Sequence, residues 1–167
     1  MVEFIELTSS TYWGRNFAKP EDFYIRPDGL RLYVVNGITS SNSNIIVSAS
    51  LTTAWNISAG TTGSAAPVIT GSYISSEPKG IYFKTDGSRL YVVGSGSMGT
   101  IQEFTLTTPW QLPTGFNPPL ISNIYAPDTN LAGISFTDNG KYCYLLGVSN
   151  KAIYEYELEN CVEYKYL

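Results

Sequence analysis

The chain contains the stretch FYIRPDGLRLYVV at residues 23–35. A close copy, IYFKTDGSRLYVV, occupies residues 81–93, and a more divergent one, ISFTDNGKYCYLL, occupies residues 134–146. The spacing defines a repeated unit of roughly 50 residues, a length typical of repeat architectures. One such unit cannot bury its own apolar face, so we expect the units to stack as an array.

Each copy combines two apolar runs with a turn between them. The turn contains Asp-Gly or Asn-Gly, which tolerate positive φ and are typical of tight β-hairpins. We align Asp28 and Asp86 with Asp138, and we assign the recurrence of these carboxylates to turn geometry rather than to catalysis or calcium binding. Each copy therefore predicts a hairpin.

A third strand is expected after each hairpin, at residues 46–51, 101–106 and 153–158. A short fourth strand is expected at 68–74, 120–125 and 161–166, with irregular loops at 56–67 and 111–119. Four antiparallel strands in a repeated meander are typical of β-propeller blades. The sequence thus predicts one all-β domain over residues 1–167, with about three repeats (20–76, 77–128 and 129–167) and a partial blade at 1–19.

The first residues hold part of a further repeat. Residues 2–8 (VEFIELT) align with residues 101–107 (IQEFTLT), so they resemble a third strand without the first two strands of its blade. An unpaired strand edge tends to pair with another chain, which favours a homo-oligomer. The candidate subunit contacts are Val2, Phe4, Ile5, Leu7 and Trp13.

Composition narrows the functional classes. The chain has 43% hydrophobic residues, a net charge of −4 and no histidine. Without histidine, Ser-His-Asp and Cys-His catalysis and most catalytic zinc sites are excluded. No basic cluster suggests nucleic-acid binding, and no apolar run reaches the ~20 residues of a membrane span. We therefore expect no enzyme activity, no cofactor or metal, no nucleic-acid partner and no membrane insertion; the first residues also lack the pattern of a signal peptide. Ser-Lys and paired-carboxylate chemistry stay open, and with them a hydrolase or lyase propeller as a third alternative.

The three tryptophans recur with the repeat. Trp13, Trp55 and Trp110 each follow a third strand. Aromatic faces of this kind can stack on sugars, but repetition favours packing between blades. A sugar-binding surface stays open as the alternative.

Two other residue types also recur. Glu103, Glu155 and Glu157 lie on third strands and are expected on solvated faces. Cys143 occupies the position that leucine holds in the other two copies, so we expect a small buried hydrophobic residue rather than a bridge to Cys161.

The segment from LYVVG at 90–94 to IQEFTLTTPW at 101–110 resembles the repeat of viral β-propeller proteins. Similar repeats occur in virion structural proteins of tailed bacteriophages, especially marine and cyanobacterial ones. The resemblance implies a non-catalytic virion protein, namely a capsid decoration, head-fibre or tail component that is assembled in the host cytoplasm. Its partners would be further copies and other virion proteins. The alternative function is a glycan-binding adhesin module that attaches to a host cell surface.

Overall fold

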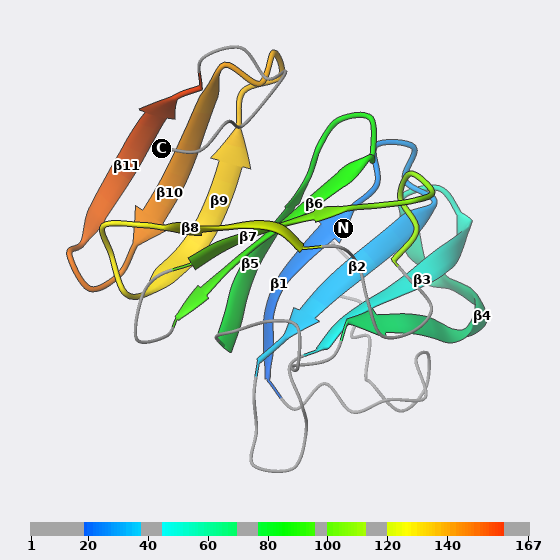
Figure 1. Cartoon of the computed structure of the whole chain (residues 1–167). Coiled ribbons are helices and arrows are strands. Elements are labelled where there is room, and N and C mark those ends of the chain that lie inside the picture. Colours follow the sequence, from blue (N-terminus) through cyan, green and yellow to red (C-terminus); the bar gives the residue numbers. More distant parts are fainter. Residues whose placement is uncertain (1–18, 38–44, 70–76, 96–99, 113–119, 159–167) are drawn as a thin grey trace, which may run out of the picture.

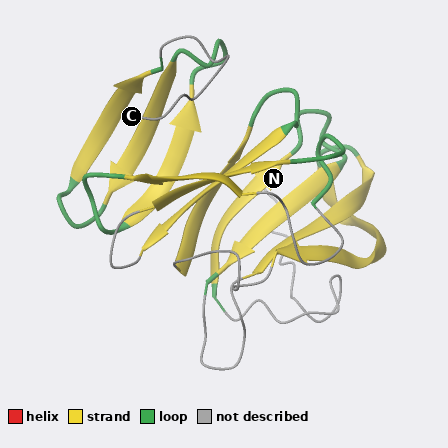
Figure 2. Ribbon diagram, in the orientation of Figure 1, coloured by secondary structure: helices red, strands yellow, loops and turns green. Residues whose placement is uncertain are grey.

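The structure is a computed structural model that describes residues 19–37, 45–69, 77–95, 100–112 and 120–158. All regular elements in these ranges are β-strands, and each pairs with its sequence neighbour in one of three antiparallel sheets (Figures 1 and 2). Sheet I contains β1 (Pro20–Ile25), β2 (Arg31–Asn36), β3 (Ile45–Thr53) and β4 (Asn56–Ile69). Sheet II contains β5 (Glu77–Phe83), β6 (Arg89–Ser95), β7 (Thr100–Thr105) and β8 (Leu120–Tyr125). Sheet III contains β9 (Leu131–Phe136), β10 (Tyr142–Gly147) and β11 (Ala152–Glu157). The prediction of an all-β fold with antiparallel sheets is confirmed.

The first strands of the sheets lie next to one another. β5 contacts β1 on one side and β9 on the other, whereas β4 and β11 lie at opposite outer sides of the molecule (Figure 1). The sheets consequently pack face to face in chain order.

The hairpin turns have the same geometry in all three sheets. The side-chain oxygens of Asp28, Asp86 and Asn139 accept a hydrogen bond from the backbone N–H two residues further on, at 2.9, 2.9 and 3.0 Å. The glycine that follows each of these residues has a φ of 72°, 72° or 67°. The alignment of Asp138 with the two aspartates was therefore wrong, because the three turns have equal length and Asn139 occupies the equivalent position.

The fourth strand of sheet I also differs from the prediction. Residues 56–67, expected to be an irregular loop, belong to the 14-residue strand β4. The chain reverses at Ala54-Trp55, so that Thr53 pairs directly with Asn56. The left-handed backbone of Trp55, with a φ of 61°, permits this tight reversal. The predicted strand at 120–125 coincides with β8, and the one at 161–166 lies outside the described residues.

Each sheet has two faces, because alternate side chains of a strand point in opposite directions. We call the face with Tyr33, Tyr91 or Tyr144 the forward face, and the face with Leu32, Leu90 or Cys143 the rear face. The forward face of sheet I packs on the rear face of sheet II, through buried residues that include Tyr33, Val35 and Ile46 against Phe83, Leu90 and Val92. The forward face of sheet II packs on the rear face of sheet III in the same way, with Tyr91, Val93 and Ile101 against Leu131, Cys143 and Leu145.

Cys143 is 4% exposed in this second interface, as the sequence predicted. Burial raises the pKa of its thiol to about 12, so the thiol stays protonated at neutral pH.

Candidate functional site

The forward face of sheet III is exposed, although the same face is buried on the other two sheets. Leu146 is 47% exposed, whereas its counterparts Val35 and Val93 are 0% and 1% exposed. Ile153 is 73% exposed and lies directly opposite Leu146 in the pairing of β10 with β11. The two side chains therefore form an apolar pair in the position that the neighbouring sheet covers elsewhere in the molecule.

A tyrosine–glutamate pair lies beside these apolar residues. Tyr144 and Glu155 are directly opposite each other on β10 and β11, and a hydrogen bond to the Glu155 carboxylate raises the pKa of the Tyr144 hydroxyl. Sheet II has the equivalent pair, in which the Tyr91 hydroxyl lies 3.4 Å from Glu103 Oε1. The pair of sheet II is buried under sheet III, whereas in the pair of sheet III Tyr144 is half-buried and Glu155 is exposed.

The burial of Glu103 corrects the expectation that this residue lies on a solvated face. Glu103 is 1% exposed because sheet III covers the forward face of sheet II. Arg89, on the adjacent strand of the same sheet, forms an ion pair with its Oε1 atom. Glu155 and Glu157 do lie in exposed positions, as expected.

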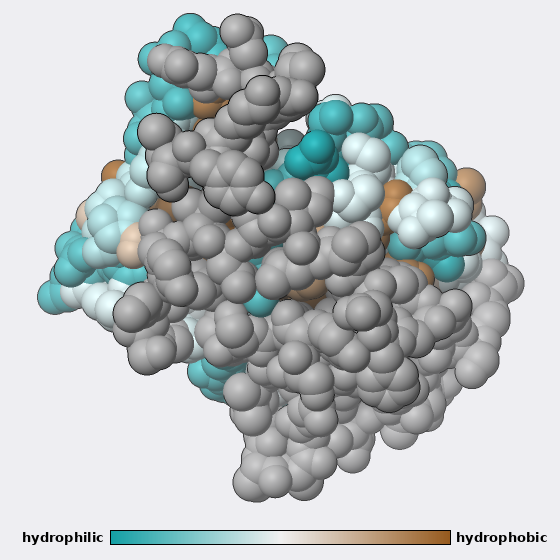
Figure 3. Space-filling model, in the orientation of Figure 1, coloured by the Kyte–Doolittle hydropathy of each residue, from teal (hydrophilic) through white to brown (hydrophobic). Residues whose placement is uncertain are grey.

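The rear face of sheet I is the other face that is partly open. Phe23 is 64% exposed and Trp55 is 61% exposed, although Ile81, the counterpart of Phe23 in sheet II, is 4% exposed. Four residues of the same face are buried, namely Leu32, Val47, Ala49 and Leu51. The open part of this face is therefore its β1 side and the turn that carries Trp55. In the space-filling view, small brown apolar areas interrupt the teal and white surface of the described residues (Figure 3).

Trp110 shows what this tryptophan position does inside the molecule. Its ring stacks on Tyr24 of sheet I and on Phe83, with centroid distances of 6.1 and 5.4 Å. Its carbonyl oxygen accepts a hydrogen bond of 2.5 Å from the Tyr33 hydroxyl of sheet I. Trp110 thus packs between sheets, whereas the ring of Trp55 is largely exposed.

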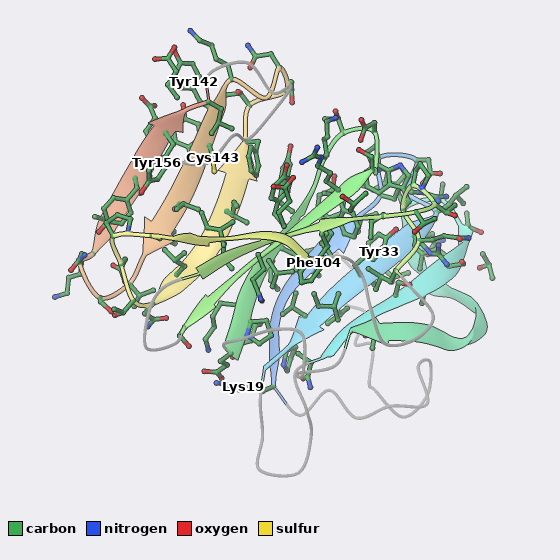
Figure 4. All side chains as sticks on the ribbon, viewed as in Figure 1. Lys19, Tyr33, Phe104, Tyr142, Cys143 and Tyr156 are labelled. Atoms are coloured by element: carbon green, nitrogen blue, oxygen red, sulfur yellow. The ribbon has the colours of Figure 1, made fainter. Side chains whose placement is uncertain are left out.

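Four charged side chains join sheets I and II where β1 and β5 begin. Lys19 and Glu21 occupy the same repeat positions as Glu77 and Lys79, so the charges are reversed between the sheets. Lys79 lies 2.8 Å from Glu21, and Lys19, marked at the start of β1 in Figure 4, pairs with Glu77. The hydrogen bond from Lys19 lowers the pKa of Glu77. This crosswise arrangement links the two sheets and also places two ammonium groups beside two carboxylates.

The predicted subunit contacts Val2, Phe4, Ile5, Leu7 and Trp13 lie outside the described residues. Within the described ranges, no group of three or more acidic or cysteine side chains is arranged to hold a metal ion. No helix in those ranges is long and apolar enough to cross a membrane.

The sequence analysis did not identify Leu146, Ile153 and Phe23 as candidate functional residues. The repeat alignment identified their positions as apolar, but exposure differs between equivalent positions and becomes visible only once the sheets are placed.

No protein-family model and no curated protein matches the chain. Several solved structures do. One is the "putative 6-phosphogluconolactonase" of Bacteroides uniformis, with 18% identity, a TM-score of 0.56, and coverage of 84% of this chain and 36% of that chain. Another, of the same description, comes from Bacteroides fragilis, with 15% identity, a TM-score of 0.56, and coverage of 84% and 35%. A third is the hydrazine synthase of Kuenenia stuttgartiensis, with 12% identity, a TM-score of 0.59, and coverage of 87% and 46%.

These neighbours are β-propeller-like folds, and at such identities the likeness shows the fold alone. The chain spans about a third to a half of the length of the proteins it matches.

The expectation that the chain is not an enzyme has to be corrected, because all three of these neighbours carry the name of an enzyme. The error has a chemical reason. The lack of histidine excludes catalysis by imidazole, but carboxylates and amines can also act as general bases and acids.

Proposed function

We propose that sheets I, II and III are consecutive β-propeller blades and that the chain acts through protein–protein assembly at the forward face of sheet III. The observation that carries the proposal is the contrast between equivalent positions: Val35 and Val93 are buried under a following sheet, and Leu146 is 47% exposed. A face whose two counterparts inside the molecule both bind another sheet is suited to bind one as well.

The apolar character of the face supports the same function. Burying an isoleucine or leucine side chain is worth about 1.5–3 kcal/mol, and Leu146 and Ile153 are adjacent. Shape is supplied by the sheet itself, which holds both residues on rigid strands. The virion setting, as capsid decoration, head fibre or tail, rests on the repeat resemblance and remains part of the proposal.

Native mass spectrometry of the chain and of Ile153→Glu tests this function. We expect the unmodified chain to assemble at micromolar concentration and Ile153→Glu to dissociate. Thr85→Glu is the matched control, because it adds the same charge at an exposed turn position of sheet II. Assembly of Ile153→Glu that equals that of Thr85→Glu would refute the proposal.

A second candidate function comes from the neighbours named as putative 6-phosphogluconolactonase. Hydrolysis of a phosphorylated sugar lactone needs a group that activates water and a cation that binds phosphate. The carboxylates of Glu21 and Glu77 and the ammonium groups of Lys19 and Lys79 provide these two kinds of group side by side, although their ion pairs would have to open for either to act on substrate. Lactone hydrolysis by the purified chain that falls in Lys79→Met would support this function, and a rate equal to spontaneous hydrolysis would exclude it.

Glycan binding remains the third candidate, and the exposed indole of Trp55 is the feature that favours it. A glycan array probed with the chain and with Trp55→Ala tests it, and binding that Trp55→Ala retains would count against this surface.

A further inference from the structure

We infer that the forward face of sheet III binds the rear face of sheet I of a second copy of this chain, so that copies associate head to tail. The inference rests on the proposed assembly function and names its partner. The argument for this partner is that the same type of contact, a forward face against a rear face, already occurs twice between the sheets of one copy.

The two open faces are the two halves of one type of interface. Inside the molecule, a forward face always meets a rear face, first between sheets I and II and then between sheets II and III. The forward half is open on sheet III, at Leu146 and Ile153. The rear half is open on sheet I only along β1 and at the turn, at Phe23 and Trp55, whereas Leu32, Val47, Ala49 and Leu51 of that face are already buried. One copy therefore presents both of the surfaces that a head-to-tail contact joins.

The contacts of Trp110 indicate how Trp55 would sit in the second copy. Trp110 packs on Tyr24 of the adjoining forward face, whose counterpart on sheet III is Ser135, and its carbonyl oxygen accepts a hydrogen bond from Tyr33. Tyr144 is the counterpart of Tyr33 on sheet III. In the head-to-tail contact, the Tyr144 hydroxyl would exchange its hydrogen bond to Glu155 for one to the Trp55 carbonyl of the other copy.

Charge favours this arrangement over one in which two forward faces meet. The forward face of sheet III carries Glu155 and Glu157, both exposed, so a symmetric contact between two such faces would bring carboxylates together. Like charges placed opposite each other across a sheet interface are destabilising. The rear face of sheet I presents the exposed side chain of Phe23 and the half-buried side chain of Ile25 instead.

The residues at the start of the first strand of each sheet are also compatible with a head-to-tail contact. Asn130 and Ala132 of sheet III occupy the repeat positions of Lys19 and Glu21. They are neutral, so the Lys19–Glu21 pair of the second copy would meet no like charge. A head-to-tail contact of this kind produces a ring if its rotation closes. The described residues of two copies would supply six sheets, within the four to about eight blades typical of propellers.

The test uses one variant on each face. Ile153→Glu alters the forward face, Phe23→Glu alters the rear face, and Thr85→Glu is the control with the same charge. Both altered residues are largely exposed, and circular dichroism with urea unfolding verifies that the fold is retained. We expect each face variant alone to associate at least tenfold more weakly than the control.

Mixing the two variants provides the decisive measurement. One copy keeps an intact rear face and the other an intact forward face, so an equimolar mixture should form a 1:1 heterodimer, which native mass spectrometry distinguishes by mass. If Ile153→Glu dissociates but Phe23→Glu does not, and the mixture forms no heterodimer, the head-to-tail contact is wrong while assembly at the forward face stands. If neither variant associates more weakly than Thr85→Glu, or if the unmodified chain is monomeric, both proposals fall.

Discussion

Replacement of Gly87 by alanine should destabilise the protein more than the equivalent substitution at Gly29. Gly87 has a φ of +72°, and a Cβ atom placed there would lie 2.3 Å from Nε1 of Trp110. An L-residue in the left-handed region loses about 1–2 kcal/mol. Displacing a packed side chain adds about 1–3 kcal/mol. We therefore expect Gly87→Ala to lower the free energy of unfolding by about 2–5 kcal/mol.

Gly29 provides the matched control, because its φ is also +72° and its Cβ would lie 2.3 Å from Cδ1 of Trp55. The difference is the freedom of the tryptophan. In a single copy, Trp55 is 61% exposed and can swing into water, whereas the ring of Trp110 is held by Tyr24 and Phe83. Gly29→Ala should therefore lower the free energy of unfolding only by the cost of the left-handed backbone conformation, about 1–2 kcal/mol.

Urea unfolding followed by circular dichroism measures both losses, provided that the slope of the transition is unchanged. The double variant Gly87→Ala/Trp110→Ala isolates the steric part, because removing the indole removes the clash. A double-mutant cycle should then give a coupling of about 1–3 kcal/mol. Equal destabilisation by Gly29→Ala and Gly87→Ala would refute the argument that the packing of Trp110 sets the difference.

Two further predictions concern buried groups. Arg89→Met should lower the free energy of unfolding by about 3 kcal/mol, because it leaves the Glu103 carboxylate buried without its cation. Lys84→Met, which breaks an exposed ion pair, should lower the free energy of unfolding by less than about 1 kcal/mol in the same urea assay. Equal losses in the two variants would contradict the burial argument. The thiol of Cys143, with its pKa raised to about 12 by burial, should react with a disulfide reagent at pH 8 far more slowly in the folded than in the unfolded protein, measured in a Cys161→Ser background. Because folding favours the neutral thiol, the contribution of Cys143 to stability is complete below the ordinary thiol pKa of 9.0 and is lost as the pH rises through about 12. If unfolding does not raise the reaction rate at pH 8, the thiol is accessible in the folded protein and the prediction is wrong.

The repeat made the strands and turns predictable. Alternating apolar residues around an Asp-Gly turn have few conformations available, and the first three strands of each sheet form where the sequence indicated. The repeat also predicted the burial of Cys143, because equivalent positions in stacked sheets meet equivalent surroundings.

The remainder depended on contacts that are distant in sequence. Residues 56–67 look irregular because they are rich in glycine, threonine and serine, yet pairing with β3 gives their backbone hydrogen bonds and makes them a strand. Glu103 resembles a surface residue in its own strand. Its burial depends on sheet III, which begins more than 20 residues later, and on Arg89 in the neighbouring strand.

The repeat also supplies an internal control for the open faces, which an isolated exposed leucine would lack. Scattered apolar residues on a surface are common and carry little information. Leu146 and Ile153 differ, because the same two positions are occupied by Val35 and Ile46 in sheet I, where both are 0% exposed. The interface between sheets I and II thus specifies what fits on sheet III: an apolar rear face with a tryptophan at its turn. Sheet I of another copy carries such a face, and a partner without it should not replace the second copy.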